Sequence, residues 1–431
     1  MLNMKNDIIN FLKNKRILIL GYGREGKSAL NFIQANLPEA DFVVADQQDL
    51  EIAGVKTICG PDYLNTVQDY DIIIKSPGVV IKDYLDDTQK AKITSLTDLF
   101  LRFTKNSVIG ITGTKGKSTT SSLIYHILQN CGKNAVLVGN IGKPCFDIID
   151  ELKSNTIVVY ELSCHQLEFI QASPHIAILL NIYQEHLDHY LSAEGYYDAK
   201  KNIFRHQGAD DLLIYGDIFQ HTDPAELDAY PMHKLDIYRD IHIPREFIKT
   251  HLLGEHNYYD ILAASAACEA CGVSQADILN AVATFHGLPH RLEFVGEFQG
   301  IKFYNDSIAT AQEAVINAVK ALGDVDTLIL GGMDRGLDYH ILVEYLRTSS
   351  VRNVILLPNT IESFERIFNE APHAQLLVPV ENMQQAVDKA FRLTAAGHTC
   401  LLSPAAASYG FYKNFEERGA DFCKLIKNHV Q

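Results

Sequence analysis

The chain has 431 residues, of which 47% are hydrophobic and 21% are charged. This composition is typical of a folded globular protein and argues against a disordered chain. The formal net charge of −15 argues against a nucleic-acid-binding protein, because phosphate backbones are bound by clustered Lys and Arg. A chain of this length is expected to form two or three domains.

Targeting and membrane signals are missing from the sequence. Lys5 and Lys13 interrupt the apolar residues of the segment 1–19, so it has no signal-peptide core, and no other stretch is apolar for long enough to span a bilayer. The eight cysteines are scattered and predict reduced thiols. Cys268 and Cys271 form a CxxC inside an alanine-rich helical pattern, which favours helix packing over a metal or redox role. We predict a cytoplasmic protein with neither a membrane nor a nucleic-acid partner.

Short apolar runs alternate with segments of helical spacing along the chain. Each run has the length of a strand buried on both faces. The alternation predicts an α/β fold of parallel sheets with crossover helices. Changes in motif content predict domains at 1–98, 99–288 and 289–431. The runs are RILIL (16–20), DFVVAD (41–46), DIIIKSPG (71–78), SVIGITG (107–113), TIVVYEL (156–162), HIAILLNI (175–182), IKFYNDS (301–307), TLILGG (327–332), NVILLP (353–358) and TCLLSP (399–404).

A glycine-rich loop follows the first run. Gly21, Gly23 and Gly26 precede a helical segment, and Asp46 ends the next strand about twenty residues further on, as in a dinucleotide-binding βαβ unit. By itself this motif is weak, and it favours an NAD-dependent dehydrogenase for the first hundred or so residues.

A second glycine-rich loop lies between the SVIGIT run and a helical segment. The glycines let the backbone approach a phosphate, and the helix N-terminus offers N–H groups. We expect Lys117 to neutralise the β- and γ-phosphates of a nucleotide and Ser118 to bind magnesium. The first glycine of a strict Walker A motif would fall on Ile111; a lysine-capped glycine turn is the alternative, and a dehydrogenase would not need this loop. Its residues are Gly113, Thr114, Lys115, Gly116, Lys117, Ser118 and Thr119.

Candidate metal ligands follow the next two strands. Glu161 ends the TIVVYE run, and Asn181, Glu185, His186 and Asp188 follow HIAILL. A carboxylate beside a phosphate loop suits Mg²⁺, whereas a histidine is a less usual ligand. Each of these residues is also compatible with a solvated loop.

Lys200 lies in a segment with helical spacing, 196–204. An ammonium group beside divalent ions is electrostatically unfavourable, and burial favours the neutral amine. A neutral amine can take up carbon dioxide and become a carbamate, an anion that can bridge metal ions. An exposed lysine on a helix is the alternative.

The order of the motifs resembles that of the Mur ligases, and in particular of their D-glutamate-adding members. The likeness covers nearly the whole chain, and the last motif is the most distinctive. It implies a Rossmann-like N-terminal domain for a UDP-sugar, a central P-loop-type parallel sheet for ATP, and a Rossmann-like C-terminal domain for the incoming amino acid. The motifs are GTKGKST (113–119), ELSCHQLE (161–168), EHLDHY (185–190), DAKKNIF (198–204), GEHN (254–257), HRLEF (290–294), YNDSIAT (304–310), GGMDRG (331–336) and SPAAASYGFYKNFEERG (403–419).

The resemblance implies a reaction and its metal ions. Such an enzyme uses ATP to join D-glutamate to UDP-N-acetylmuramoyl-L-alanine, a peptidoglycan precursor, through an acyl phosphate. Lys117, His186 and Lys200 are the implied catalytic residues. Ser118 and Glu161 would hold a first Mg²⁺, and His186 with a carbamylated Lys200 would hold a second. The resemblance also implies a monomer.

The resemblance further assigns binding residues to all three domains. It places the UDP diphosphate at the first glycine-rich loop and uracil near Asp46. Arg335 is a candidate partner for a carboxylate, although an exposed loop arginine is the alternative. The implied UDP-sugar residues are Gly21, Gly23, Gly26, Asp46, Ser76, Pro77, Gly78 and Asn140; those for adenine and ribose are Asn257, Arg291 and Asp306; those for the amino acid are Thr310, Arg335, Ser408 and Phe415.

One motif departs from the family pattern. Ile308 and Ala311 stand where NDSKATN has lysine and asparagine. Loss of a charged hydrogen bond costs on the order of 1.5 to 3 kcal/mol, unless Lys115 or Arg335 compensates. The departure leaves open a divergent paralogue that uses L-glutamate or another acidic amino acid, a folylpolyglutamate-synthase-like ligase, and a non-catalytic UDP-sugar-binding module.

Overall fold

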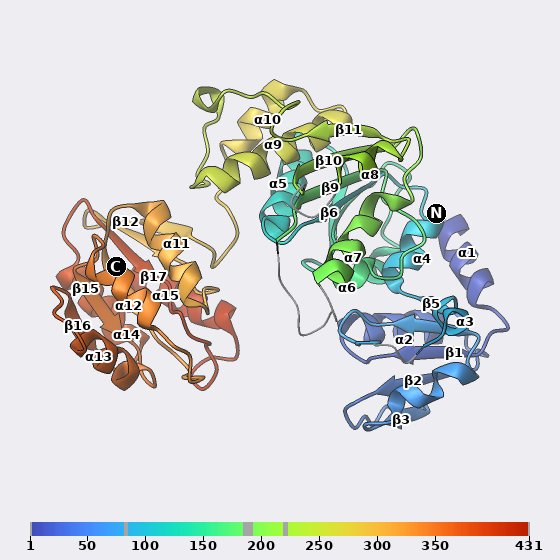
Figure 1. Ribbon diagram of the computed structural model, residues 1–431, viewed down its shortest axis with the longest axis horizontal. Helices are drawn as coiled ribbons and strands as arrows, with labels where there is room; N and C mark the ends of the chain where they lie inside the picture. Colours follow the sequence, from blue (N-terminus) through green and yellow to red (C-terminus); the bar gives the residue numbers. More distant parts are fainter. Residues whose placement is uncertain (1, 82–84, 184–192, 219–222, 430–431) are drawn as a thin grey trace. The chain divides into compact units, whose positions relative to one another are not determined.

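The computed structural model contains three β-sheets with helices packed on both faces, which confirms the predicted α/β class (Figure 1). The chain forms two compact units. The first two sheets belong to one unit, Met1–Lys249 with Glu255–Ala283, and the third belongs to the other, Thr250–Gly254 with Thr284–Gln431. The residues that the structure describes are 2–81, 85–183, 193–218 and 223–429.

The first sheet is parallel, with the strand order β3-β2-β1-β4-β5. Ile17 and Ile19 of β1 face one apolar cluster, whereas Leu18 and Leu20 face another, so this strand is buried on both sides. The strand order reverses between β1 and β4, and the loops after such strands are where ligands bind in open α/β sheets. The elements are α1 (Leu2–Leu12), β1 (Ile17–Leu20), α2 (Arg24–Asn36), β2 (Phe42–Asp46), β3 (Thr57–Cys59), η1 (Tyr63–Asp69), β4 (Ile72–Lys75), α3 (Asp87–Lys90), β5 (Ile93–Thr94) and α4 (Leu96–Phe103).

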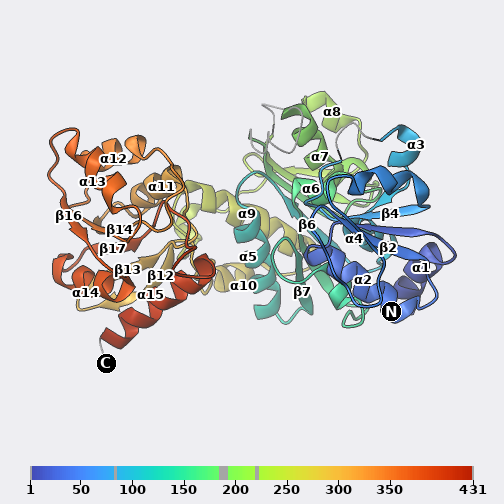
Figure 2. The ribbon, with the colours of Figure 1, turned by 90° about the horizontal axis from the view of Figure 1, so that it is seen from below.

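The second sheet is also parallel, with the order β11-β10-β9-β6-β8-β7. Helices α5, α9 and α10 lie on one side of it and α6 and α7 on the other (Figure 2). One apolar cluster includes residues of both sheets, such as Ile19 and Val158, so the two sheets share a core. The elements are β6 (Val108–Thr112), α5 (Lys117–Asn130), β7 (Ala135–Gly139), η2 (Cys145–Ile148), β8 (Ile157–Glu161), α6 (Cys164–Leu167), β9 (Ile176–Asn181), α7 (Ala193–Arg205), β10 (Leu212–Asp217), α8 (Pro224–Asp228), β11 (His233–Asp236), η3 (Arg245–Phe247), α9 (Glu255–Ala270) and α10 (Gln275–Val282).

The third sheet has the order β12-β13-β17-β14-β15-β16. Helices α11, α12 and α13 cover one face, and α14 and α15 cover the other (Figure 2). Leu328 and Leu330 of β14 face the first group of helices, whereas Ile329 faces the second. The elements are β12 (Glu293–Phe298), β13 (Ile301–Asn305), α11 (Gln312–Leu322), β14 (Val325–Leu330), α12 (His340–Arg347), β15 (Asn353–Leu356), α13 (Ile361–Asn369), β16 (Leu376–Pro379), α14 (Met383–Leu393), β17 (Thr399–Leu402) and α15 (Phe415–His429).

The third sheet has one antiparallel edge strand. Strand β12 runs antiparallel to β13. The two strands are joined by Gln299 and Gly300 alone, and a parallel connection would need about a dozen residues or more. Both linking residues have positive φ, 54° and 76°, as a tight hairpin turn requires.

The cysteines form no disulfide in the described part of the chain. All eight cysteines lie among the described residues and are free, and Cys268 is buried in α9. No helix in the described part of the chain has the length and apolar character needed to cross a membrane.

Candidate functional site

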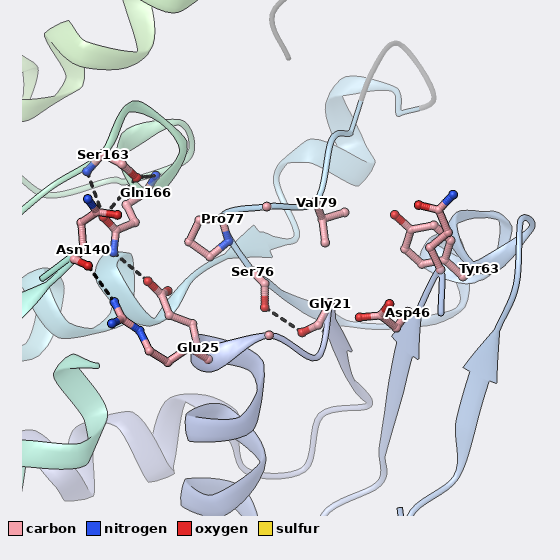
Figure 3. A pocket seen from close by; sticks show the side chains of 14 residues that line it. Gly21, Glu25, Asp46, Tyr63, Ser76, Pro77, Val79, Asn140, Ser163 and Gln166 are labelled. Atoms are coloured by element: carbon pink, nitrogen blue, oxygen red, sulfur yellow. Dashed lines mark hydrogen bonds between the residues drawn. The ribbon is translucent and has the colours of Figure 1, made fainter. Parts of the chain in front are cut away.

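A cavity of about 330 Å³ lies at the carboxyl ends of β1 and β4. It extends from Asn140, Ser163 and Gln166 at one end to Asp46 and Tyr63 at the other (Figure 3). Most residues that were expected to bind a UDP-sugar line this cavity, namely Gly21, Gly23, Asp46, Ser76, Pro77, Gly78 and Asn140. The elongated lining suits a ligand with a base at one end and phosphates toward the other.

Short contacts fix the loops around the cavity. Ser76 Oγ donates a hydrogen bond to the Gly21 carbonyl at 2.7 Å, which joins the loops that follow β1 and β4. Asp46 accepts a hydrogen bond from the Tyr22 amide at 2.6 Å. Gly26 lies behind the loop, where a Cβ would be only 2.0 Å from the Gly21 carbonyl oxygen. The Gly23 N-cap makes no side-chain cap with any described residue, so the start of α2 suits an anion.

The sequence reasoning missed several residues of the cavity, including Arg24 and Glu25. Arg24 donates to the carbonyls of Gly139 at 2.5 Å and Asn140 at 3.1 Å. Gln166 donates to one oxygen of Glu25 at 2.7 Å. The other oxygen is buried without a hydrogen-bond partner among the described residues, and burial raises the pKa of Glu25. The only sequence signal for these two residues was their charge within a glycine-rich loop. Their hydrogen-bond partners lie more than 100 residues away in sequence.

The second glycine-rich loop connects β6 to α5. Gly113 and Gly116 have φ of 156° and 88°, and a Cβ on Gly116 would lie 2.5 Å from Asp260 Oδ1. Lys117 Nζ donates to the carbonyls of Gly113 at 2.8 Å and Thr114 at 3.0 Å. Within the described residues, no side chain caps α5 at Gly116. The loop therefore combines a closely folded backbone, an ammonium group and a helix N-terminus, which fits a nucleotide phosphate.

Neighbouring elements support this loop. Asn181 at the end of β9 accepts a hydrogen bond from the Lys115 amide at 2.9 Å and donates to the Lys115 carbonyl at 3.1 Å. The hydroxyls of Thr114 and Tyr196 share a hydrogen bond of 3.1 Å. Lys200 on α7 is 2% exposed, and its Nζ donates to the Gly113 carbonyl at 2.9 Å. The alternative of an exposed Lys200 on a helix is therefore wrong.

Glu161 at the end of β8 is fully buried. One carboxylate oxygen accepts from Asn140 Nδ2 at 2.8 Å, and the other accepts from Ser121 Oγ at 3.3 Å. Ser121 Oγ also lies 3.4 Å from the Ser118 carbonyl, so Glu161 is close to the first turn of α5. Carboxylate and hydroxyl oxygens are ligands that Mg²⁺ prefers.

Three of the expected metal ligands belong to a segment that the structure does not describe. Glu185, His186 and Asp188 lie outside the described residues. The residues that the structure does describe include no group of three or more His, Cys, Asp and Glu side chains suited to a metal ion. Glu161, with the Ser121 hydroxyl at 3.3 Å from it, lies beside the phosphate loop and fits a magnesium ion that also binds phosphate oxygens.

The residues expected around adenine and ribose belong to different units. Asn257 lies on α9 of the first unit, whereas Arg291 and Asp306 lie in the second. Asp306 accepts hydrogen bonds from Ser403 Oγ at 2.8 Å and from the Leu292 amide at 3.2 Å. Burial raises the pKa of Asp306 to about 6.

The residues expected to bind the amino acid gather at one edge of the third sheet. Thr310 follows β13, Arg335 follows β14, Ser408 follows β17, and Phe415 begins α15. Strand β17 lies between β13 and β14 and is parallel to both, so the three loops emerge at the same edge. The exposed guanidinium of Arg335 lies over the ring of Tyr409 at 5.8 Å, which brings two of these loops together.

Comparison with known proteins identifies the family. The description "Mur ligase middle domain" matches residues 111–223, and "Mur ligase, glutamate ligase domain" matches 290–406. UDP-N-acetylmuramoylalanine--D-glutamate ligase of Geobacillus kaustophilus is 35% identical over 96% of this chain and 98% of that protein. The protein of the same name from Staphylococcus aureus is 33% identical over 97% and 98%. The chain belongs to the Mur ligase family.

The fold of this Mur ligase is similar to that of several solved structures. UDP-N-acetylmuramate-alanine ligase of Thermotoga maritima has a TM-score of 0.57 at 18% identity, covering 96% of this chain and 100% of that one. A MurF ligase of Thermotoga maritima, solved in complex with ADP, has a TM-score of 0.55 at 15% identity, covering 100% and 97%. The matches confirm the resemblance and the fold that were predicted from the motifs.

Gly26 provides a test of the first loop of this Mur ligase. Gly26→Ala would place a methyl group against a backbone oxygen, so we expect a loss of about 1 to 3 kcal/mol in the free energy of unfolding. Gly23→Ala is the matched control, because no described atom beyond its chain neighbours lies within 4 Å of its Cβ, and we expect only the cost of alanine at an N-cap, about 0.5 kcal/mol. Thermal unfolding followed by circular dichroism compares the two; equal melting temperatures would contradict the loop geometry.

Asp306 provides a test of pH dependence. Because its folded-state pKa is raised from 3.8 to about 6, its stabilising contribution is fully present below about pH 4 and is lost as the pH rises through about 6. The loss corresponds to about 3 kcal/mol. Asp306→Asn removes this titration, so calorimetry between pH 4 and pH 7 should show the wild type losing stability relative to the variant.

Asp324 is the matched control for this experiment. Hydrogen bonds from Thr399 and Lys302 outweigh its burial and lower the pKa of Asp324. Its stabilising contribution is therefore present above about pH 4 and lost only on further acidification, so the wild type and Asp324→Asn should differ by a constant amount between pH 4 and pH 7. The same trend in both variants would show that the Asp306 assignment is wrong.

Proposed function

We propose that this Mur ligase joins D-glutamate to UDP-N-acetylmuramoyl-L-alanine with ATP, as a step in the synthesis of peptidoglycan precursors. The observation that carries the proposal is the pairing of the elongated cavity with the phosphate loop. Asn140 lines the cavity and donates a hydrogen bond to Glu161, which lies beside the first turn of α5. The names of the relatives at 31 to 35% identity support the choice of substrates.

The proposed domain roles follow the three sheets. Residues 1–98 would bind the UDP-sugar, 99–288 would bind ATP, and 289–431 would bind the amino acid. The range 1–98 contains the cavity loops after β1 and β4, and 99–288 contains the loop between β6 and α5. A cytoplasmic location and a monomeric state complete the proposal.

The phosphate loop would hold ATP with its γ-phosphate toward the substrate carboxylate. Lys117 would turn from the loop carbonyls of Gly113 and Thr114 to the β- and γ-phosphates. The carboxylate of the UDP-linked alanine then displaces ADP and becomes an acyl phosphate. The amine of glutamate attacks this carbonyl, phosphate leaves, and an amide forms. The residues of the site act by positioning and by stabilising negative charge.

Two magnesium ions would neutralise the phosphates and the developing oxyanion, the first held by Ser118 and Glu161 and the second by His186 and a carbamylated Lys200. The burial of Lys200 supports the carbamate, because a charged ammonium is costly there. The neutral amine would attack carbon dioxide, form an N–C bond and release a proton.

Ile308 supports a second candidate within the same reaction class. A lysine that would face the phosphate or the incoming carboxylate is replaced by an apolar residue, whereas Arg335 is still exposed on a neighbouring loop. A paralogue that uses L-glutamate or another acidic amino acid therefore remains the alternative.

Turnover with defined acceptors tests the proposed function. ADP release should be measured with UDP-N-acetylmuramoyl-L-alanine and a panel of D- and L-amino acids, and then with folate. We expect release with D-glutamate. Preference for another acidic amino acid favours the paralogue, turnover with folate favours a folylpolyglutamate-synthase-like enzyme, and no release with any acceptor favours a UDP-sugar-binding module.

Lys200 tests the second metal site. Lys200→Ala removes the carbamate, so we expect the loss of most activity, and a small carboxylic acid such as acetate should partly restore it. Lys201→Ala is the control, because Lys201 is on the same helix but pairs with Glu226 at 2.7 Å. Acetate should not stimulate that variant. A wild-type rate for Lys200→Ala would remove the carbamate from the mechanism.

A further inference from the structure

The guanidinium of Arg418 is a buried cation. The residue is 1% exposed, and its partners are all neutral: Nε donates to Ser307 Oγ at 3.0 Å, Nη1 to the Ala406 carbonyl at 3.0 Å, and Nη2 to the Ser307 carbonyl at 2.8 Å. A buried charge is unfavourable unless it is paired. Burial lowers the pKa of Arg418 to about 10, so the group stays charged at neutral pH.

Two of the acids near Arg418 on α15 have other partners. Asp421 accepts a hydrogen bond from the Tyr412 hydroxyl at 2.7 Å, and Glu417 accepts one from the Lys413 amide at 2.7 Å. No ion pair to Arg418 occurs in the part of the chain that the structure describes. The positive charge of this side chain is therefore not neutralised within the described protein.

Arg418 also lies where three loops meet. It holds the loop after β13 through Ser307 and the loop after β17 through Ala406. The loop after β14 passes directly over it, because a Cβ on Gly332 would lie 3.0 Å from Nη1 of Arg418. The amide of Met333 in that loop donates to the Ala407 carbonyl at 2.8 Å.

These loops carry the proposed amino-acid residues Thr310, Arg335 and Ser408. The fourth, Phe415, precedes Arg418 by three residues on α15, and its carbonyl accepts a hydrogen bond from Ser307 Oγ at 2.8 Å. One side chain therefore connects all of the elements from which an amino acid would be bound. It is itself too deeply buried to touch a ligand.

We propose that Arg418 is a positioning residue for the incoming amino acid, which fixes the three loops and whose unpaired charge favours a ligand with two carboxylates. The inference rests on the proposed function and deepens it. A charge in a low-dielectric interior acts on a nearby anion more strongly than one in water. Arg418 thereby supplies a positive charge beneath the loop after β13, in which Ile308 carries none.

Steady-state kinetics of the full-length enzyme tests this role. Arg418→Met removes the charge at similar volume. Arg418→Lys keeps the charge but loses the planar guanidinium and its several hydrogen-bond donors. For the Met variant we expect the KM for glutamate to rise about tenfold or more, and the preference for glutamate over glutamine to fall by a similar factor. The KM values for ATP and the UDP-linked acceptor should stay within about twofold. The Lys variant should keep the preference for glutamate.

Arg347→Met is the matched control. Arg347 is also bonded to neutral groups, the carbonyls of Ile367 and Phe368 at 2.7 and 3.2 Å, but it ends α12 at the opposite edge of the sheet. We expect a lower melting temperature without a change in the KM for glutamate. The same pattern in Arg418→Met would reduce Arg418 to a structural residue and overturn the proposal.

Ser307→Ala provides a second variant should Arg418→Met fail to fold. It removes the acceptor of Nε and the hydrogen bond to Phe415 while leaving the charge in place. We expect a raised KM for glutamate with the preference over glutamine retained; an unchanged KM would contradict the positioning role. Failure of the wild type to use any acidic amino acid would instead remove the proposed function, and the inference with it.

Discussion

The direction of parallel strands is the constraint on which the rest of this structure depends. Each crossover helix returns the chain to the same end of the sheet, so every loop that leaves a strand emerges at the carboxyl edge. The cavity loops follow β1 and β4, the phosphate loop follows β6, Glu161 ends β8, and the loops held by Arg418 follow β13, β14 and β17. Residues far apart in sequence thereby meet without any local signal of their proximity.

This constraint explains why much of the fold could be predicted. Most of the ten predicted runs are strands buried on both faces, so they are continuously apolar and visible in the sequence. Strand β13 is an exception, because it contains Lys302 and alternates buried and partly buried residues. Several of the missed strands lacked this signature: β12 is only partly buried and contains Gly296, and β3 and β5 are three and two residues long. Strand β7, AVLVG, has the signature and was missed all the same. The antiparallel hairpin escaped notice because its turn, Gln299-Gly300, has glycine but not the asparagine or aspartate that usually marks such turns.

Residues of the candidate site could be predicted from the sequence where the backbone conformation allows only glycine. Gly116 and Gly26 could be chosen from the sequence because close approach of the chain excludes a Cβ. Contacts between side chains and distant loops could not be found this way. Whether Lys200 lies in solvent or against the Gly113 carbonyl depends on how α7 packs beneath the loop, and the same holds for Arg24 and the Gly139 carbonyl. Sequence alone gave Lys200 two opposite interpretations, and only tertiary packing chose between them.

The treatment of positive charge links these sites. A ligase that gathers a triphosphate, a diphosphate and an acidic amino acid must offset many negative charges, yet the chain carries a net charge of −15. Its cations are therefore placed locally: Lys117 lies within the phosphate loop, and Arg418 lies under the loops of the third sheet. Burying a cation costs stability in the empty protein, but it strengthens the interaction with an anion that arrives, because little water is left to screen it. The presence of Ile308 where the family motif has lysine is compatible with function on this view, since the buried charge of Arg418 lies against the same loop.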